Sequence, residues 1–460
     1  MRHGWGAAIG ASAASVAALL FAALLFHVSH AGAAPQAEGG RSFMGVASCA
    51  GSTCHGRSEA NGKVVRQDEL MLWQSASSPT GAHSRAWRVL TEPRGKAIAG
   101  RLGLGNAGSA AMCVGCHATP AGAGQRGARF QRSDGVGCEG CHGAASAWLA
   151  SHYAVGGTHA ANVARGMVPL ENPRARAAKC LDCHFGSADQ GQFVNHRIMA
   201  AGHPRISFEL DLFTTLQQHH NEDADYAQRK GRSSPVQVWA VGQAMALERS
   251  LGLFASARGT EGVFPEFYFF DCHTCHRRIS DEPSFAPNPT NNPGRPIPTG
   301  MPAYNDENMI MLSAAARVAA PGLSARFEQD SRAFHQALAS DRPAAVAAAA
   351  RLRESARAVG NAFAGNGVSR EQTFAIIQAI AGNAVSARFT DYEGSVQAVM
   401  AVDTLLSALV KSGQVAPGAE KAIRADIELA YRAVREPNAF RAGDFRASLG
   451  RAAAAIGRLK

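Results

Sequence analysis

The sequence predicts a mainly α protein built from two unlike parts. All ten cysteines lie between Cys49 and Cys275, in a segment without a clear strand pattern, and none follows Asn305. From Asn305 onward, apolar residues recur at the three- and four-residue steps of amphipathic helices. We therefore expect a domain of short helices and long loops at residues 41–280 and an α-helical bundle at residues 303–460. A connector rich in proline, residues 281–302, separates them.

The first 33 residues have the features of a signal peptide. Arg2 precedes an apolar run from Ala7 to Phe26, and Ala31-Gly32-Ala33 supplies a cleavage site of small residues. The same run is long enough to cross a bilayer, so an uncleaved membrane anchor is the alternative. In both cases we expect the rest of the chain to be exported, to the periplasm or an equivalent compartment.

The chain is basic, with a net charge of +10 and an isoelectric point near 9.3. Such a balance is typical of proteins that bind nucleic acid or acidic membranes. The positive residues are scattered along the sequence, however, and no nucleic-acid-binding motif accompanies them. We expect a solvated basic surface and no nucleic-acid partner.

Each cysteine pair is followed directly by a histidine. Four pairs have the spacing C-x-x-C-H, and they are Cys113/Cys116/His117, Cys138/Cys141/His142, Cys180/Cys183/His184 and Cys272/Cys275/His276. A further pair, Cys49 and Cys54 with His55, has four residues between its cysteines.

These motifs match the chemistry of covalent haem attachment. Two thiols add to the two vinyl groups of one haem, and the adjacent histidine binds the iron as proximal ligand. Zinc also uses C-x-x-C pairs, but zinc does not explain a histidine after every pair. Iron–sulfur clusters need cysteine groupings that this sequence lacks. The four regular motifs therefore predict haem c, and the porphyrins are expected to form the core of residues 41–280.

The pair Cys49 and Cys54 has a second interpretation. In an exported chain these thiols could close a small disulfide loop or stay unused. The longer spacer still lets both thiols reach the vinyl groups if the loop bulges, and Gly51 and Ser52 permit a bulge. Because His55 stands where the proximal ligand belongs, we expect a fifth haem here.

The chain also holds enough histidines to give each iron a second imidazole. Of its 17 histidines, three lie in or beside the signal segment and five follow cysteine pairs, which leaves nine. These nine are His83, His152, His159, His196, His203, His219, His220, His273 and His335. His335 lies apart from the cysteines, and we interpret it as structural.

With these motifs, residues 43–280 resemble the multihaem cytochrome c family that includes the tetrahaem electron carrier paired with hydroxylamine oxidoreductase (cytochrome c-554-like). The resemblance rests on Cys49 to His55 and on the phrases "HSRAWRVL", "GVGCEGCHG", "WLASH", "KCLDCHFG", "VNHRIMAAGHPRISFEL" and "DCHTCH". It implies distal iron ligation by His83, His152, His196, His203 and one of His219 and His220, for which we choose His219. His159 is a weaker candidate, and His273 lies inside its own attachment loop. The fifth haem and the C-terminal extension depart from the tetrahaem carrier.

Three apolar faces support the predicted C-terminal bundle. Val399, Val402, Leu406, Leu409 and Val410 form one face, Phe374, Ile376, Ile377 and Ile380 a second, and Ile423, Ile427, Leu429 and Tyr431 a third. Breaks near Pro321, Gly365, Gly413 and Pro437 predict four to six helices.

Several haems fixed in one exported chain predict an electron relay between redox partner proteins or quinol-linked donors. Bis-histidine ligation would close the iron position that an enzyme needs. The alternative is an enzyme acting on nitric oxide, hydroxylamine or nitrite at one five-coordinate haem, although the lysine-ligated C-x-x-C-K motif is missing. A third is a binding role carried by residues 303–460. The sequence does not name the partners or the oligomeric state. We also expect arginines near the ligands, Arg85, Arg88, Arg197 and Arg205, to lie against haem propionates.

Overall fold

The computed structural model describes residues 40–60, 65–188, 192–260, 264–276, 296, 301–385 and 392–460. The signal segment and almost all of the connector lie outside these residues. Ser42–Lys460 form one compact unit. The described part of this unit is mainly helical, as predicted, and its β-pairing consists of three isolated bridges, Phe43–Arg126, Ser187–Gln192 and Phe270–Tyr304.

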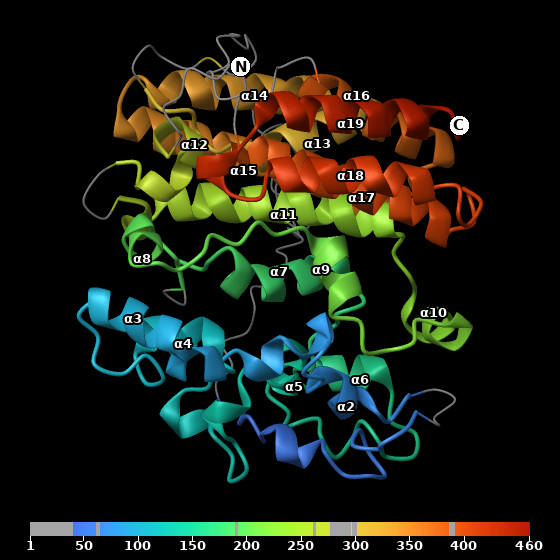
Figure 1. The fold of residues 1–460 in the computed structure, drawn as a ribbon. Coiled ribbons are helices and arrows are strands. Elements are labelled where there is room, and N and C mark those ends of the chain that lie inside the picture. The colour runs from blue at the N-terminus through green and yellow to red at the C-terminus, as the bar shows by residue number, and fades with distance from the viewer. Residues whose placement is uncertain are drawn as a thin grey trace, which may run out of the picture. The chain divides into compact units, whose positions relative to one another are not determined.

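The cysteine-bearing segment contains short helices joined by loops, again as predicted (Figure 1). The α-helices are α2 (Glu69–Trp73), α3 (Pro93–Arg101), α4 (Ala111–His117), α5 (Cys138–His142), α6 (His159–Ala164), α7 (Pro173–His184), α8 (His196–Ala200), α9 (Leu210–Leu216), α10 (Ala224–Lys230) and α12 (Cys272–Cys275). The 3₁₀ turns are η1 (Val46–Ser48), η2 (Pro79–Gly81), η3 (His83–Arg85), η4 (Arg88–Thr91), η5 (Ala123–Gln125), η6 (Arg132–Asp134), η7 (Ala257–Thr260) and η8 (Phe267–Phe269). The four regular motifs lie within or at the end of α4, α5, α7 and α12.

One helix of this segment is long and differs from the expected pattern. Helix α11 (Pro235–Ala255) begins with a capping box in which Ser234 accepts from Gln237 N and the Gln237 side chain accepts from Ser234 N. Pro235 at its first position fits the helix start. Most of its buried apolar residues, among them Trp239 and Phe254, belong to the same hydrophobic core as the C-terminal helices, whereas Val238 and Ala246 pack with Leu181 of α7. A helix from the cysteine-bearing segment therefore completes the bundle.

The C-terminal segment is helical, with more helices than the four to six predicted. Its described residues form seven α-helices: α13 (Glu307–Ala319), α14 (Pro321–Leu338), α15 (Arg342–Gly365), α16 (Arg370–Val385), α17 (Tyr392–Lys411), α18 (Lys421–Ala433) and α19 (Ala442–Gly457), with the turn η10 (Pro437–Ala439). The predicted breaks fall at helix ends, since Pro321 opens α14 and Gly365 closes α15. The break at Asp341, which caps α15 by accepting from Ala344 N, was missed.

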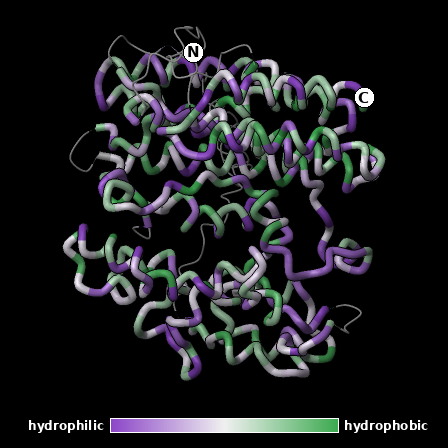
Figure 2. The backbone as a smooth tube through the Cα atoms, viewed as in Figure 1, coloured by the Kyte–Doolittle hydropathy of each residue, from purple (hydrophilic) through white to green (hydrophobic). Residues whose placement is uncertain are grey.

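The bundle has an apolar interior that most residues of the predicted faces supply. Leu429, which was assigned to the third face, is instead 39% exposed. Phe374 and Ile377 on α16, Val399 and Leu406 on α17, and Ile427 on α18 are each at most 1% exposed. Figure 2 shows hydrophobic stretches alternating with hydrophilic ones along these helices, as amphipathic packing requires. Among the described helices, α17 is long and apolar enough to cross a membrane, but 83% of that stretch is buried inside the protein. It is the central helix of a protein core.

Candidate functional site

The ten cysteines occur in the structure as free thiols, partly or fully accessible, and no disulfide links them. Cys49 and Cys54 are therefore not joined in the small disulfide loop that the sequence left open. Both lie in the loop after η1, and His55 follows them.

Each motif histidine faces a second histidine. The pairs, with the distances between their ring centres, are His55 with His152 at 6.3 Å, His117 with His203 at 6.1 Å, His184 with His83 at 5.9 Å, and His276 with His196 at 6.1 Å. His142 faces both His219, at 6.4 Å, and His220, at 5.8 Å. The structure thus brings together every predicted proximal ligand and a predicted distal one.

These distances fit an iron held between two imidazoles. A histidine nitrogen lies about 2 Å from a bound metal, and about 1.2 Å separates that nitrogen from the ring centre, given ring bonds near 1.35 Å. Two imidazoles on opposite sides of one iron then have ring centres about 6.4 Å apart. The observed range, 5.8–6.4 Å, includes this value. Two cysteines beside each pair supply the groups that attach a haem covalently.

Hydrogen bonds fix which ring nitrogen is free to bind iron. The Nδ1–H of His117 donates to the Ala86 carbonyl at 2.7 Å, and that of His203 to the Pro204 carbonyl at 2.8 Å. His55 donates from Nδ1 to the Glu69 carboxylate at 3.0 Å. When Nδ1 carries the proton, the neutral imidazole presents an unprotonated Nε2. Metal-ligating histidines typically hold the ring in place through such a hydrogen bond from the nitrogen that does not bind the metal.

The third motif has two candidates for its distal ligand. The ring nitrogens of His142, His219 and His220 lie within 4.8 Å of one another. His219 donates from Nδ1 to the Gln217 carbonyl at 2.8 Å, whereas Nδ1 of His220 lies 3.9 Å from Glu69 Oε1. The firm Nδ1 bond orients His219 as a ligand and favours it over His220.

Burial keeps several of these imidazoles neutral. It lowers the pKa of His142 to about 3 and that of His184 to about 4. Burial also lowers the pKa of His83 and of His203. His55 differs, because its hydrogen bond to Glu69 raises its pKa. Neutral imidazoles have a lone pair for iron at neutral pH.

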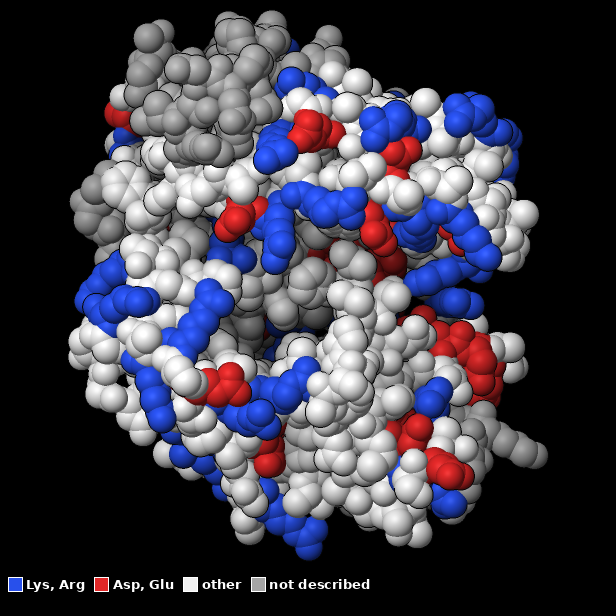
Figure 3. Space-filling view, viewed as in Figure 1, with Lys and Arg blue, Asp and Glu red and all other residues white. Residues whose placement is uncertain are grey.

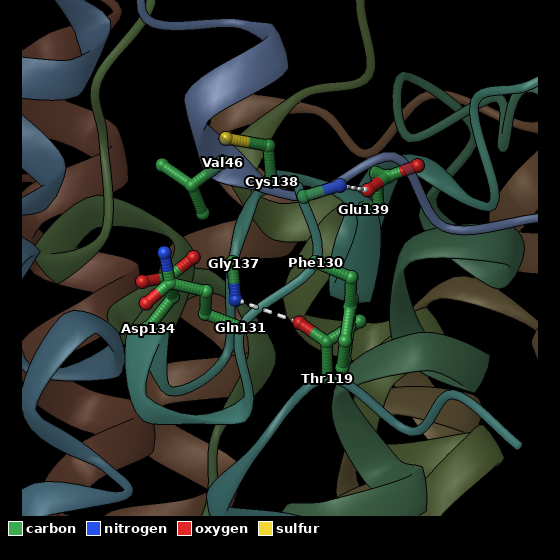
Figure 4. A pocket seen from close by; sticks show the side chains of 9 residues that line it. Val46, Thr119, Phe130, Gln131, Asp134, Gly137, Cys138 and Glu139 are labelled. Atoms are coloured by element: carbon green, nitrogen blue, oxygen red, sulfur yellow. Dashed lines mark hydrogen bonds between the residues drawn. The ribbon is translucent and has the colours of Figure 1, made fainter. Parts of the chain in front are cut away.

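The attachment segments contact one another across the sequence. Cys183 Sγ of the fourth motif lies 3.9 Å from the Gly115 carbonyl in α4, inside the second motif. The second and third motifs also meet, because Gly137 N donates to Thr119 Oγ1 at 2.9 Å. Figure 4 shows a small pocket between the first and third segments, with Val46, Cys138 and Glu139 in its wall. Groups attached at these motifs would be close neighbours.

Glu139, inside the third motif, accepts hydrogen bonds from the backbone that precedes the first motif. Its Oε1 accepts from Met44 N and Ala145 N, and its Oε2 accepts from Gly45 N, each at 2.8 Å. The side chain is buried. The sequence did not predict this role, because the two residues between the cysteines of a C-x-x-C-H motif have no fixed identity.

The fifth motif is held by the bundle. Glu393 at the start of α17 accepts from Cys272 N at 3.2 Å, and Asp271 accepts from Tyr392 N at 2.6 Å and from Glu393 N. Each carboxylate therefore caps the start of the other helix. His273 donates from Nδ1 to the Pro437 carbonyl at 2.9 Å. Burial raises the pKa of Glu393 to about 8 and that of Asp271 well above its usual value.

The histidines that were given lesser roles have other partners. His159 Nε2 lies 2.8 Å from the Glu171 carboxylate, and His335 lies deep in the bundle with Nε2 3.1 Å from Asp306. His273 donates to the Pro437 carbonyl. All three histidines thus form hydrogen bonds with groups other than the motif histidines, and we prefer other residues as distal ligands.

The four arginines chosen as propionate partners lie in different settings. Arg205 lies 3.8 Å from Glu307 and 3.5 Å from Glu393, and its Nη2 is buried without a hydrogen-bond partner among the described residues. Arg88 is 71% exposed and pairs with Glu92. Arg85 donates to the Ser75 carbonyl and Arg197 to the Leu102 carbonyl. Contact of these arginines with propionates stays a prediction, and Arg88 has a surface position.

Comparison with known proteins identifies one matching family. Residues 48–143 match the family model described as cytochrome c554 and c-prime. No curated protein and no solved structure matches the chain. The matched range contains the first three attachment motifs and the distal candidate His83.

Proposed function

We propose that the whole chain is an exported multihaem cytochrome that carries electrons between redox partners through five covalently bound haems, because residues 48–143 match the family model of cytochrome c554 and c-prime. Redox proteins or quinol-linked donors are the expected partners. The family match supports a protein that binds haem c and carries electrons. The number of haems and the export of the chain are our proposal.

The observation that supports five haems is the set of five facing histidine pairs. Three of them, His55/His152, His117/His203 and His142 with His219 or His220, have their motif histidine inside the matched range. The pairs His184/His83 and His276/His196 have theirs beyond it, yet their ring centres are a similar distance apart. A similar spacing of the two imidazoles at all five motifs favours the same cofactor at all five.

The arrangement also favours electron transfer over catalysis. Bound haem supplies a reversible one-electron couple, whose potential depends on axial ligands, burial and nearby charge. The chain's own residues supply two imidazoles at each motif and hold the attachment segments in contact. An iron with two protein ligands has no open position for nitric oxide, hydroxylamine or nitrite. The enzyme alternative would require one of these distal histidines to leave.

A spectroelectrochemical titration of the purified holoprotein tests the proposal. It should take up five electrons per chain, and the reduced protein should not bind carbon monoxide. Uptake of only four electrons would show that the chain does not bind a fifth haem. Carbon monoxide binding to one haem in five would support the enzyme alternative instead. Sequencing the N-terminus of the exported protein tests cleavage after residue 33 separately.

A further inference from the structure

The positive charge of the chain is concentrated around the second attachment motif. Residues 85–132 contain eight arginines and lysines against a single acidic residue, Glu92, which gives a net charge of +7 in 48 positions. The whole chain has a net charge of +10. The expectation of evenly scattered charge therefore fails for this segment.

Five cations of this region form what we call the basic surface: Arg88, Arg94, Lys96, Arg101 and Arg197, all exposed. Hydrogen bonds link the elements that carry them. Arg94 and Arg101 on α3 donate to the carbonyls of Gly202 and Ala201 after α8, each at 2.8 Å. Arg197 on α8 donates to the Leu102 carbonyl at the end of α3. Figure 3 shows Lys and Arg side chains gathered over this part of the molecule, with few acidic ones among them.

The charge of this surface is poorly compensated by the protein. Carbonyl partners leave a guanidinium its full positive charge. Among the five cations, and within the described residues, Arg88 forms an ion pair with Glu92 at 3.4 Å. Both side chains are largely exposed, and such pairs contribute little to stability. The basic surface thus presents a positive potential to solvent.

A small apolar cluster connects this region to the second attachment segment. It contains Leu90 of η4 and Ala99 of α3, and Cys113 and Val114 of α4 pack against it. Both imidazoles of the second pair are tied to this region. His117 donates to the Ala86 carbonyl just before η4, and His203 directly follows the Ala201 and Gly202 carbonyls that Arg101 and Arg94 bind. A molecule bound to the basic surface would therefore lie next to the elements that hold both imidazoles of the second pair.

Two exposed apolar side chains lie within residues 85–132: Val89 next to Arg88, and Met112 eleven positions after Arg101. Val89 is 39% exposed and Met112, next to Cys113, is 49% exposed. Exposed apolar groups with arginines around them are the composition of protein–protein contact surfaces. A lipid headgroup would gain nothing from lying beside a haem, whereas an electron-transfer partner must approach one.

We propose that the basic surface is the docking site of an acidic electron-transfer protein, which exchanges one electron at a time with the haem held by Cys113, Cys116, His117 and His203. The inference rests on the proposed function. Complementary charge speeds the encounter of such partners and makes it sensitive to salt.

Stopped-flow reduction of the oxidised holoprotein by flavodoxin hydroquinone, a small acidic reductant, tests this docking site. The variant Arg88→Glu/Lys96→Glu reverses two charges that hold no distal or proximal ligand in place. The control Arg332→Glu/Lys421→Glu reverses two exposed charges on α14 and α18 and changes the net charge equally. At low ionic strength we expect the first variant to react about tenfold more slowly and with a weaker salt dependence. The control should stay within about twofold of the wild type.

Two results would overturn the inference. Equal slowing of both variants would show that only the net charge of the chain matters. Salt-sensitive binding to phosphatidylglycerol vesicles that Arg88→Glu/Lys96→Glu abolishes, with an unchanged flavodoxin rate, would assign the surface to a membrane. Reduction by hexaammineruthenium(II), a small cation, separates this inference from the proposed function. If it reduces all haems of every variant, the haems work and only the docking site is at issue. If neither reductant transfers electrons to the wild type, the proposed function itself fails.

Discussion

Replacing Glu139 with alanine should loosen the chain that leads into the first attachment segment. The carboxylate accepts three backbone hydrogen bonds, from Met44 N, Gly45 N and Ala145 N, each at 2.8 Å. It is only 4% exposed, so water cannot easily replace it. Glu139→Ala leaves three amides without their acceptor, two of them on Met44 and Gly45.

The size of the effect follows from these bonds. A hydrogen bond to a charged group contributes about 1.5–3 kcal/mol. Loss of the two bonds that hold Met44 and Gly45 should lower the local opening free energy by about 3–6 kcal/mol. At about 1.4 kcal/mol per factor of ten, their amides should exchange about 10²–10⁴ times faster.

Hydrogen–deuterium exchange of the holoprotein, followed on a peptide that covers residues 42–48, measures this opening directly. Glu139→Gln is the matched control, because its amide keeps one carbonyl oxygen as acceptor and should give an intermediate rate. If Glu139→Ala exchanges at the wild-type rate in this peptide, Glu139 does not fasten the first segment to the third.

Three further predictions concern ligands and charge. His219→Ala should convert one haem from low to high spin in the EPR spectrum while His220→Ala leaves the spin state unchanged; the reverse result would make His220 the ligand. His203→Met should raise the midpoint potential of one haem, because methionine–histidine ligation favours the reduced iron, and an unchanged titration would show that His203 is not a ligand. Burial raises the pKa of Glu393 from 4.5 to about 8, so the folded state holds its proton more tightly than the unfolded state, and stability should fall as pH rises between these values. Glu393→Gln should remove part of that fall in urea midpoints measured at about pH 5 and about pH 8; an equal fall in both proteins would contradict it.

The sequence was most informative where chemistry demands a fixed local spacing. The motif histidines could be predicted because a haem needs its two thiols and its proximal imidazole within a few residues. The distal set came from a resemblance. Which distal histidine faces which motif could not be predicted, because partners such as His276 and His196 meet only through the fold.

Tertiary contacts explain the rest of what was missed. Helix α11 was overlooked because its segment was assigned to the cysteine-bearing part, although Ser234-Pro235 and Gln237 carry a clear helix start. Buried carboxylates such as Glu139 and Glu393 resemble surface residues in a sequence, and only their backbone partners reveal them. The charge around α3 was visible as a local count, but its place over Cys113 depends on helix packing.

The EPR spectrum of the oxidised holoprotein, integrated against its iron content, tests the five-pair account most directly. Five facing histidine pairs predict five low-spin irons per chain and no high-spin ferric signal. A high-spin iron in the intact protein, or only four irons per chain with Cys49 and Cys54 as free thiols, would contradict it.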